Sequence, residues 1–137
     1  MVIERGKASR TAEIIALSRA VESLRPATSR LFYDPYAKYF LSTKYRIVDK
    51  SRFLTRILYW FFAERPFPGS HGDQVARTRY IDDYMLECIA AGIKQLVILG
   101  AGYDSRAYRF DELKEDIKVF EVDHPDTKMV KIEKVKR

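Results

Sequence analysis

Cysteine and histidine are scarce in this chain of 137 residues, which contains one cysteine and two histidines. A lone cysteine cannot form an internal disulfide, which fits the reducing interior of a cell. Cys88, His71 and His124 lie in separate segments, so they do not form the cysteine and histidine pattern of a metal site. We therefore expect a cytoplasmic protein that holds no metal.

Long hydrophobic runs are absent as well. No stretch of about 20 apolar residues is present, which excludes a membrane-spanning helix, and the polar, charged N-terminus is unlike a secretory signal. The net charge of +6 at pH 7 raises the question of nucleic-acid binding. However, the positive charges are spread along the chain and no known nucleic-acid module is visible. We expect neither a nucleic-acid nor a membrane partner, and the sequence indicates no oligomeric state.

The N-terminal part of the chain has helical patterns. Apolar residues recur at helical spacing over residues 14–24. Asp34 followed by Pro35 predicts a helix start, because the carboxylate caps free N–H groups and proline fits the first turn. Residues 53–62 are the most aromatic stretch, which we interpret as a buried helix rather than a lid over a pocket. Residues 74–91 have the spacing of a longer helix that a glycine ends.

The pattern then changes to strands. Residues 96–99 are four consecutive large aliphatic side chains, typical of a parallel strand covered on both faces. Gly100 and Gly102 allow a sharp turn and a close approach of the backbone to a ligand, and a following helix would offer it free N–H groups. Residues 117–122 predict a second strand, and residues 106–116 are long enough for a crossover helix between parallel strands.

Asp123 lies at the end of the second predicted strand, 21 positions after Gly102. An acidic residue at about this distance from a glycine turn can bind the ribose hydroxyls of an adenosine cofactor. A carboxylate suits this role because both of its oxygens are acceptors. The turn and the acid together predict an adenosine cofactor site, and a turn that binds nothing is the alternative.

The turn sequence GAGYDS distinguishes between two adenosine cofactors. A dinucleotide fingerprint requires G-x-G-x-x-G, but Ser105 stands at the position of the third glycine. Asp104 would repel a pyrophosphate, whereas it would attract or tolerate the amino group and sulfonium of S-adenosylmethionine. These two residues favour S-adenosylmethionine over NAD.

Four segments together resemble a known family. VILGAGYDSRAYR at residues 97–109 and VFEVDHP at residues 119–125 resemble the first two cofactor motifs of the leucine carboxyl methyltransferase family, a branch of the class I S-adenosylmethionine-dependent methyltransferases. ARTRYIDD at residues 76–83 resembles the arginine-bearing helix before the first strand, and FYDPYA at residues 32–37 resembles the N-terminal D-P-x-A segment. The resemblance implies a Rossmann-like α/β fold and an O-methyltransferase whose acceptor is a small molecule or a protein carboxylate, methylated on a carboxyl or hydroxyl group.

The resemblance also implies which residues hold the cofactor. Arginine binds a carboxylate through two parallel N–H bonds, and the family places such an arginine at Arg77 or, as the second choice, at Arg79. The cofactor-binding candidates are Arg77, Arg79, Gly100, Ala101, Gly102, Asp104, Ser105, Glu121 and Asp123. No catalytic residue is assigned. A carboxylate acceptor is ionised at pH 7 and needs no base, whereas a hydroxyl acceptor needs one, commonly histidine, and His71 and His124 are the candidates.

Methyltransferases of this class are normally built on a seven-stranded sheet, but only two strands are predicted here. Because two strands alone do not form a stable sheet, we expect the chain to be the N-terminal portion of a longer enzyme. Residues 1–92 would form a helical cap or lid region, and residues 93–137 the start of the Rossmann-like cofactor domain. Two other interpretations remain: a fragment of a dinucleotide-binding oxidoreductase, and a non-enzymatic basic module that binds a partner.

Overall fold

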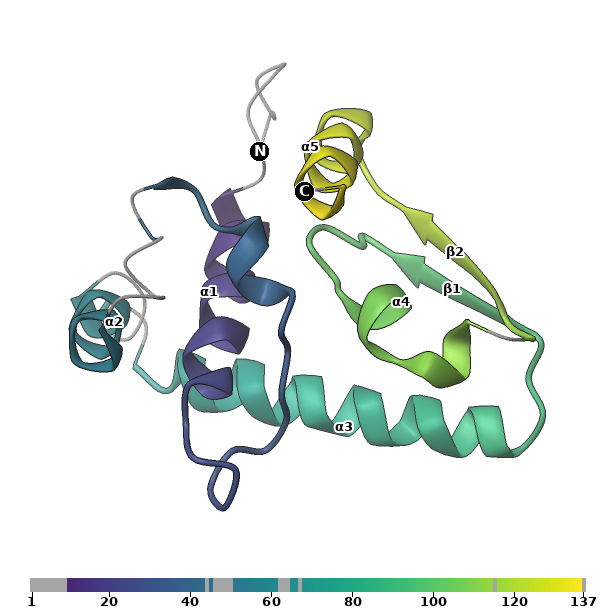
Figure 1. Cartoon of the computed structure of the whole chain (residues 1–137), viewed down its shortest axis with the longest axis horizontal. Coiled ribbons are helices and arrows are strands. Elements are labelled where there is room, and N and C mark those ends of the chain that lie inside the picture. The colour runs from purple at the N-terminus through teal and green to yellow at the C-terminus, as the bar shows by residue number, and fades with distance from the viewer. Residues whose placement is uncertain are drawn as a thin grey trace.

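The computed structural model describes residues 10–43, 45, 51–61, 65–66, 68–114 and 116–136. Helices and two short strands make up this part of the chain (Figure 1). In chain order the elements are α1 (Arg10–Ser23), the 3-10 helix η1 (Ala37–Phe40), α2 (Arg52–Tyr59), α3 (Ser70–Ala90), β1 (Gln95–Leu99), α4 (Arg106–Arg109), the 3-10 helix η4 (Asp111–Leu113), β2 (Lys118–Val122) and α5 (Pro125–Val135). The fold mixes helix and strand, which is compatible with the predicted α/β class.

The sheet consists of β1 and β2, which run parallel. Their register extends from the pair Gln95 and Lys118 to the pair Leu99 and Val122. Each strand begins within one residue of its predicted start, so both strand predictions are confirmed in position. The prediction that the first strand is covered on both faces is wrong for the described residues, because Val97 is 54% exposed and Leu99 is 76% exposed. Parallel pairing brings the carboxyl ends of both strands to the same edge, where the glycine turn follows β1 and the acidic residue follows β2.

The connection between the strands is less helical than the sequence predicts. A helix over residues 106–116 is wrong in length, because α4 ends at Arg109 and η4 follows it. Phe110 separates the two with an extended backbone, φ −104° and ψ 115°. Arg106 and Arg109 both form ion pairs with Asp82 on α3, and these contacts hold the single turn of α4 in place.

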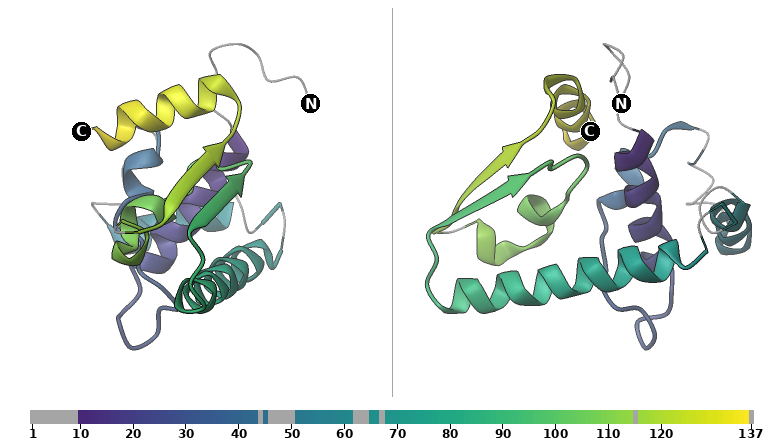
Figure 2. Two further views of the ribbon diagram at one scale, coloured as in Figure 1. Left: turned by 90° about the vertical axis from the view of Figure 1, so that its right-hand side faces the viewer. Right: turned by 180° about the vertical axis from the view of Figure 1, so that it is seen from behind.

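The longest helix, α3, organises the rest of the molecule. α1 packs against α3 near its N-terminal end, while the sheet and α4 lie along its C-terminal part (Figures 1 and 2). Leu17 and Val21 on α1 are buried, as the helical pattern predicts. Gly92 follows α3 with a φ of 90°, which confirms the predicted glycine cap. Asp34 accepts hydrogen bonds from two backbone N–H groups at the start of η1, the helix start predicted there.

One hydrophobic core joins the two predicted regions of the chain. Its buried members are Ala12, Ala16, Leu17, Ala20, Val21, Ala37, Phe40, Leu41, Tyr45, Tyr59 and Tyr103. Tyr103 belongs to the glycine turn, and its ring stacks on that of Phe40 with the centroids 5.2 Å apart. Val130 and Val135 of α5 pack against the same cluster. The turn after β1 is therefore fixed to the helical region by shared core packing.

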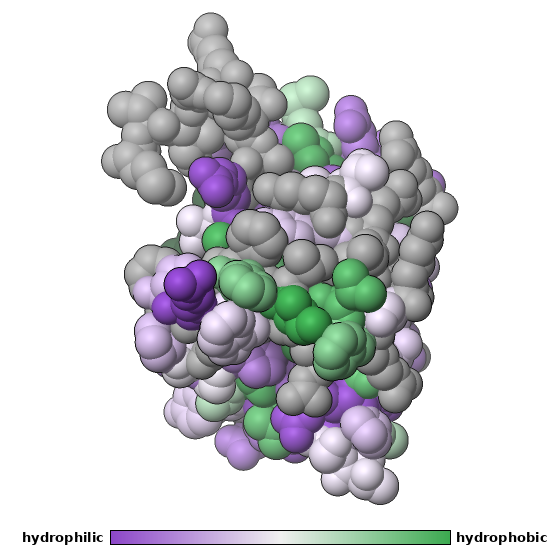
Figure 3. Space-filling view, turned by 90° about the vertical axis from the view of Figure 1, so that its left-hand side faces the viewer, coloured by the Kyte–Doolittle hydropathy of each residue, from purple (hydrophilic) through white to green (hydrophobic). Residues whose placement is uncertain are grey.

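The prediction of a buried aromatic helix is confirmed for the helix and wrong for its burial. α2 spans Arg52–Tyr59 and so begins one residue before the predicted stretch, but Phe53 is 72% exposed and Trp60 is 51% exposed, while Thr55 and Tyr59 are buried. α2 packs on α1, and Figure 3, seen from the α2 side, shows hydrophobic side chains on this face. Residue 62 lies outside the described residues. Among the described helices, none is both long and apolar enough to cross a membrane.

Candidate functional site

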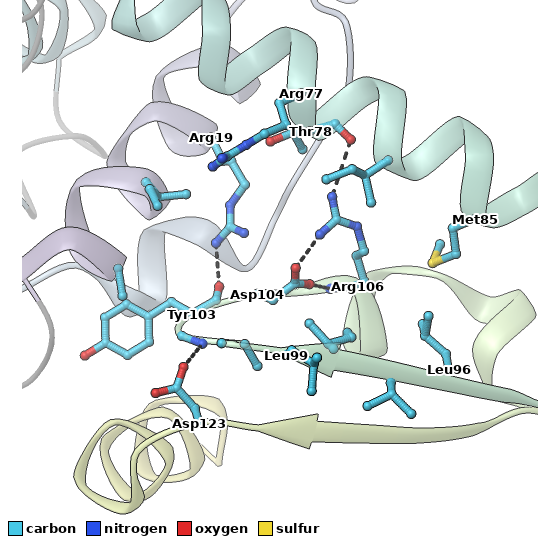
Figure 4. Close-up of a pocket in the computed structure, with 18 of the residues that line it drawn as sticks. Arg19, Arg77, Thr78, Met85, Leu96, Leu99, Tyr103, Asp104, Arg106 and Asp123 are labelled. Carbon is cyan, nitrogen blue, oxygen red and sulfur yellow. Dashed lines mark hydrogen bonds and ion pairs between the residues drawn. The ribbon is translucent and has the colours of Figure 1, made fainter.

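A cavity of about 560 Å³ lies between α1, α3, β1 and the glycine turn. Six of the predicted cofactor-binding residues line this cavity: Arg77, Gly100, Ala101, Gly102, Asp104 and Asp123. Figure 4 shows Arg77 entering from α3 and Asp123 standing at the end of β2, with the turn between them. The fold therefore brings together residues from three segments that the sequence separates.

Three other candidates do not line the cavity. The Arg79 side chain is half exposed and donates to the carboxylate of Asp83 and to the carbonyl of Leu31, each at 2.7 Å. Ser105 is fully buried, and its hydroxyl donates a hydrogen bond to the carboxylate of Asp34. Glu121 accepts a hydrogen bond from the buried Lys131 at 2.6 Å. Of the two arginines on α3, the structure places Arg77 at the cavity.

The glycine turn is shaped by backbone bonds and by a close neighbour. The Asp104 N–H donates to the Ala101 carbonyl at 2.7 Å, and the Ala101 N–H donates to the Val122 carbonyl at 3.1 Å. Gly102 has a φ of 49°, and a Cβ at this position would lie 3.2 Å from the Cβ of Ala12. Both the conformation and the space at Gly102 therefore favour glycine over a residue with a side chain.

Asp123 faces the turn from the end of β2. Its Oδ2 accepts the Gly102 N–H at 2.5 Å, and its Oδ1 accepts the His124 N–H at 2.6 Å. An ionised carboxylate has about four lone-pair positions, so both oxygens can accept further hydrogen bonds. The carboxylate is held in a fixed orientation and still has acceptor capacity toward the cavity.

Asp104 is paired within the protein. Its carboxylate accepts the Arg106 backbone N–H at 2.8 Å and forms an ion pair with the Arg106 guanidinium. The same guanidinium donates to Asp82 on α3 at 2.8 Å. The negative charge of Asp104, which favours S-adenosylmethionine in the sequence argument, is therefore largely balanced by Arg106.

Two charges at the cavity are left without an opposite charge among the described residues. Arg77 donates to the neutral side chain of Gln74 at 2.8 Å, and Asp123 is bonded to backbone N–H groups. The other lining charges form ion pairs with carboxylates or guanidinium groups. Considering the described residues alone, the site thus presents one unpaired cation and one unpaired anion on different walls of the same cavity.

Sequence reasoning missed Arg19, which lines the cavity from α1. Its side chain is 6% exposed, and its Nη2 donates to the carbonyl of Tyr103 at 2.5 Å. Burial lowers the pKa of Arg19, and the nearby Asp34 carboxylate opposes that shift. The available signal was an arginine in the same helical stripe as Ala12 and Ala16, where a solvated side chain is not expected.

Neither histidine lines the cavity. His71 is half-buried, with its Nδ1 3.0 Å from the Ser18 hydroxyl and its Nε2 3.8 Å from a Glu22 oxygen. His124 caps α5 and accepts the Asp126 N–H at 3.3 Å. Within the described part of the chain, no three His, Cys, Asp or Glu side chains are grouped as metal ligands. Among the described residues, the cavity lining therefore includes neither of the two histidines predicted as candidate bases.

Comparisons with known proteins identify the family of this chain. The profile of the leucine carboxyl methyltransferase family matches residues 12–137. A "Putative S-adenosyl-L-methionine-dependent methyltransferase" of Mycobacteroides abscessus is 36% identical over 117 residues, covering 84% of this chain and 37% of that protein. A protein of the same description from Rhodococcus jostii is 34% identical over 129 residues, covering 90% of this chain and 39% of the relative. The chain thus spans less than two fifths of the length of these relatives. It belongs to the leucine carboxyl methyltransferase family.

Proposed function

We propose that this chain holds the cofactor site of an S-adenosylmethionine-dependent O-methyltransferase with a Rossmann-like class I fold. Family membership and the descriptions of the relatives support the reaction class. The observation that carries the proposal is the pair of charges Arg77 and Asp123, which have no oppositely charged partner within the described part of the chain and lie at one cavity beside the glycine turn.

The chemistry of the cavity fits this cofactor. S-adenosylmethionine carries a carboxylate at its methionyl end and two hydroxyls on its ribose. Arg77 can bind the carboxylate through parallel N–H bonds, and Asp123 can accept hydrogen bonds from the hydroxyls. The volume of about 560 Å³ also lies within the range of about 300 to 1,000 Å³ that is common for small-molecule sites.

Each wall of the cavity has a separate task in this proposal. The glycine turn allows the backbone to approach the ligand closely, because no Cβ stands at Gly100 or Gly102. The Arg106 guanidinium balances Asp104, so the turn does not add a second free negative charge beside Asp123. When bound, S-adenosylmethionine supplies the methyl group and its sulfonium leaving group, while the protein supplies alignment and electrostatics.

For the acceptor we propose an oxygen of a carboxyl or hydroxyl group, on a small molecule or a protein. The family description supports a carboxyl acceptor. A carboxylate is ionised at pH 7 and attacks the methyl group without a base, whereas a hydroxyl needs a general base at hydrogen-bonding distance. A rate of methyl transfer that is flat between pH 6 and 9 would support the carboxylate.

Calorimetric titration with S-adenosylmethionine tests the proposed cofactor. Arg77→Met and Asp123→Asn should each weaken binding by about tenfold or more, because a hydrogen bond to a charged group contributes about 1.5 to 3 kcal/mol. Arg79→Met is the matched control on the same helix. It should leave the affinity unchanged, since Arg79 is directed to Asp83 and Leu31 instead of the cavity.

Three outcomes would contradict the proposal. Binding of NAD without S-adenosylmethionine would favour an oxidoreductase. Binding of RNA or DNA that weakens steeply with salt, with no cofactor affinity, would favour a basic binding module. Loss of affinity in Arg79→Met with none in Arg77→Met would move the carboxylate contact to the other arginine.

A further inference from the structure

Three buried polar side chains from distant segments meet behind the glycine turn. They are Arg19 on α1, Asp34 before η1 and Ser105 at the start of α4, with exposed fractions of 5%, 2% and 0%. We call them the Arg19–Asp34–Ser105 cluster. Only Arg19 of the three lines the cavity, so the cluster mainly supports the turn from outside.

The cluster holds the turn at two points. Asp34 Oδ2 accepts the Ser105 hydroxyl at 2.6 Å and lies 3.2 Å from Arg19 Nε. Arg19 Nη2 donates to the carbonyl of Tyr103 at 2.5 Å. In the sequence Asp104 lies between these two attachment points, Tyr103 and Ser105, and its carboxylate pairs with Arg106.

A second contact grips the same turn from the opposite side. Asp123 accepts the Gly102 N–H, while Arg19 binds the carbonyl of the next residue, Tyr103. Figure 4 shows Arg19 and Asp123 reaching the turn from opposite directions. The Tyr103 carbonyl shares its peptide unit with the Asp104 N–H, which closes the turn on Ala101. Fixing this one peptide therefore fixes the backbone that lines the cavity.

Stability alone does not account for the cluster. Removing two charges from water is costly, and replacement of a buried ion pair by apolar side chains is often neutral or stabilising. The Ser105 hydroxyl donates its hydrogen bond to Asp34 and does not cap the N-terminus of α4. A role in holding one backbone geometry explains why charged and hydroxyl groups stand where apolar ones would pack.

We propose that Arg19 and Asp34 are positioning residues, which hold the glycine turn in its cofactor-binding conformation before the cofactor arrives. This inference rests on the proposed function for its ligand, but not for the turn geometry. A turn that is already ordered loses less conformational freedom on binding, so the affinity for the cofactor rises.

Hydrogen exchange of the unliganded chain, paired with calorimetry, tests this role. Arg19→Met should speed hydrogen exchange of the Gly102 and Asp104 amides by about tenfold, while amides in the middle of α3 keep their protection. It should also lower the affinity for S-adenosylmethionine by a similar factor. Arg19→Lys, which keeps the charge, should restore part of both effects. Arg25→Met is the control, because Arg25 lies two residues beyond α1 and pairs with Glu22 away from the cavity.

A gentler variant covers the case in which Arg19→Met does not fold. Ser105→Ala removes one hydroxyl and leaves the Arg19 and Asp34 pair in place, and it should speed exchange of the same two amides by a smaller factor. Unchanged protection of these amides in the folded variants would overturn the proposal. Weaker cofactor binding with unchanged protection would also overturn it, since Arg19 would then act by direct contact. If the unchanged chain binds no S-adenosylmethionine, the proposed function fails, and the exchange data still decide the role of the cluster.

Discussion

An alanine at position 102 tests the close fit of the glycine turn against α1. Gly102 has a φ of 49°, and the new Cβ would lie 3.2 Å from the Cβ of Ala12 and 3.9 Å from Oδ2 of Asp123. Placing a non-glycine residue in the left-handed region destabilises the folded state by about 1 to 2 kcal/mol. Overpacking destabilises it by about a further 1 to 3 kcal/mol. Gly102→Ala should therefore lower the free energy of unfolding by about 2 to 5 kcal/mol.

Two further variants separate strain from crowding. Gly92 has a φ of 90° with no atom within 4 Å of an added Cβ, so Gly92→Ala should show the backbone strain alone, about 1 to 2 kcal/mol. Ala12→Gly removes the crowding atom on α1. In a double-mutant cycle measured by urea unfolding, Ala12→Gly should offset part of the loss in Gly102→Ala.

Cofactor affinity completes this test. Gly102→Ala should lower the affinity for S-adenosylmethionine measured by calorimetry, because a shift of the turn moves the Gly102 N–H away from Asp123. Gly92→Ala should leave the affinity unchanged. Equal stability losses in Gly102→Ala and Gly92→Ala, with additive behaviour in the cycle, would refute the close contact with Ala12.

Three other substitutions probe buried polar groups in the described part of the chain. Asp82→Asn removes the negative charge that pairs with both Arg106 and Arg109 and should cost about 3 to 5 kcal/mol in urea unfolding; a loss below about 1 kcal/mol would show that these ion pairs are dispensable. Lys131→Met leaves the carboxylate of Glu121 without its 2.6 Å partner and should cost about 1 to 3 kcal/mol; a more stable variant would contradict this. The buried Tyr103 hydroxyl has no hydrogen-bond partner among the described residues, so Tyr103→Phe should be neutral or stabilising at pH 7. Burial raises the pKa of Tyr103 above its ordinary value of about 10, so the native state keeps the phenol proton to a higher pH than the unfolded chain does. The free energy of unfolding should therefore fall as the pH rises above about 10, and it should fall less in Tyr103→Phe.

The parts of the site that follow from local sequence were predictable. Four aliphatic residues in a row specify β1, and the glycines after it specify the turn, because both signals act over a few residues. The position of Asp123 followed from the spacing of two parallel strands, whose carboxyl ends meet at one edge. Gly100, Gly102 and Asp123 therefore line the cavity as the pattern indicates.

The parts that depend on distant partners were not predictable. Ser105 turns from the cavity because Asp34, 71 residues earlier, accepts its hydroxyl. Glu121 accepts a hydrogen bond from Lys131 on α5, which follows β2 in the sequence. Arg77 and Arg79 are two residues apart on one helix, and only the path of the neighbouring chain, with the Leu31 carbonyl beside Arg79, separates their roles.

The same limit explains the elements that differ from their predictions. The crossover region contains only one turn of α4, because Phe110 is extended and tertiary ion pairs to Asp82 hold Arg106 and Arg109. α2 has the apolar composition of a core helix, but it contacts α1 and leaves Phe53 exposed. The composition of a segment shows which of its side chains are apolar enough to be buried. The packing of neighbouring elements determines which of them are buried in the folded chain.

The most direct test of the central claim is a nitrogen-15 NMR titration of the chain with S-adenosylmethionine. We expect the amide signals of Gly100, Ala101 and Gly102 and the side-chain Nε signal of Arg77 to shift together and to saturate, while the Nε signal of Arg79 stays in place. Saturating S-adenosylmethionine that leaves the glycine-turn amides unmoved, or NAD that moves them when S-adenosylmethionine does not, would contradict the account.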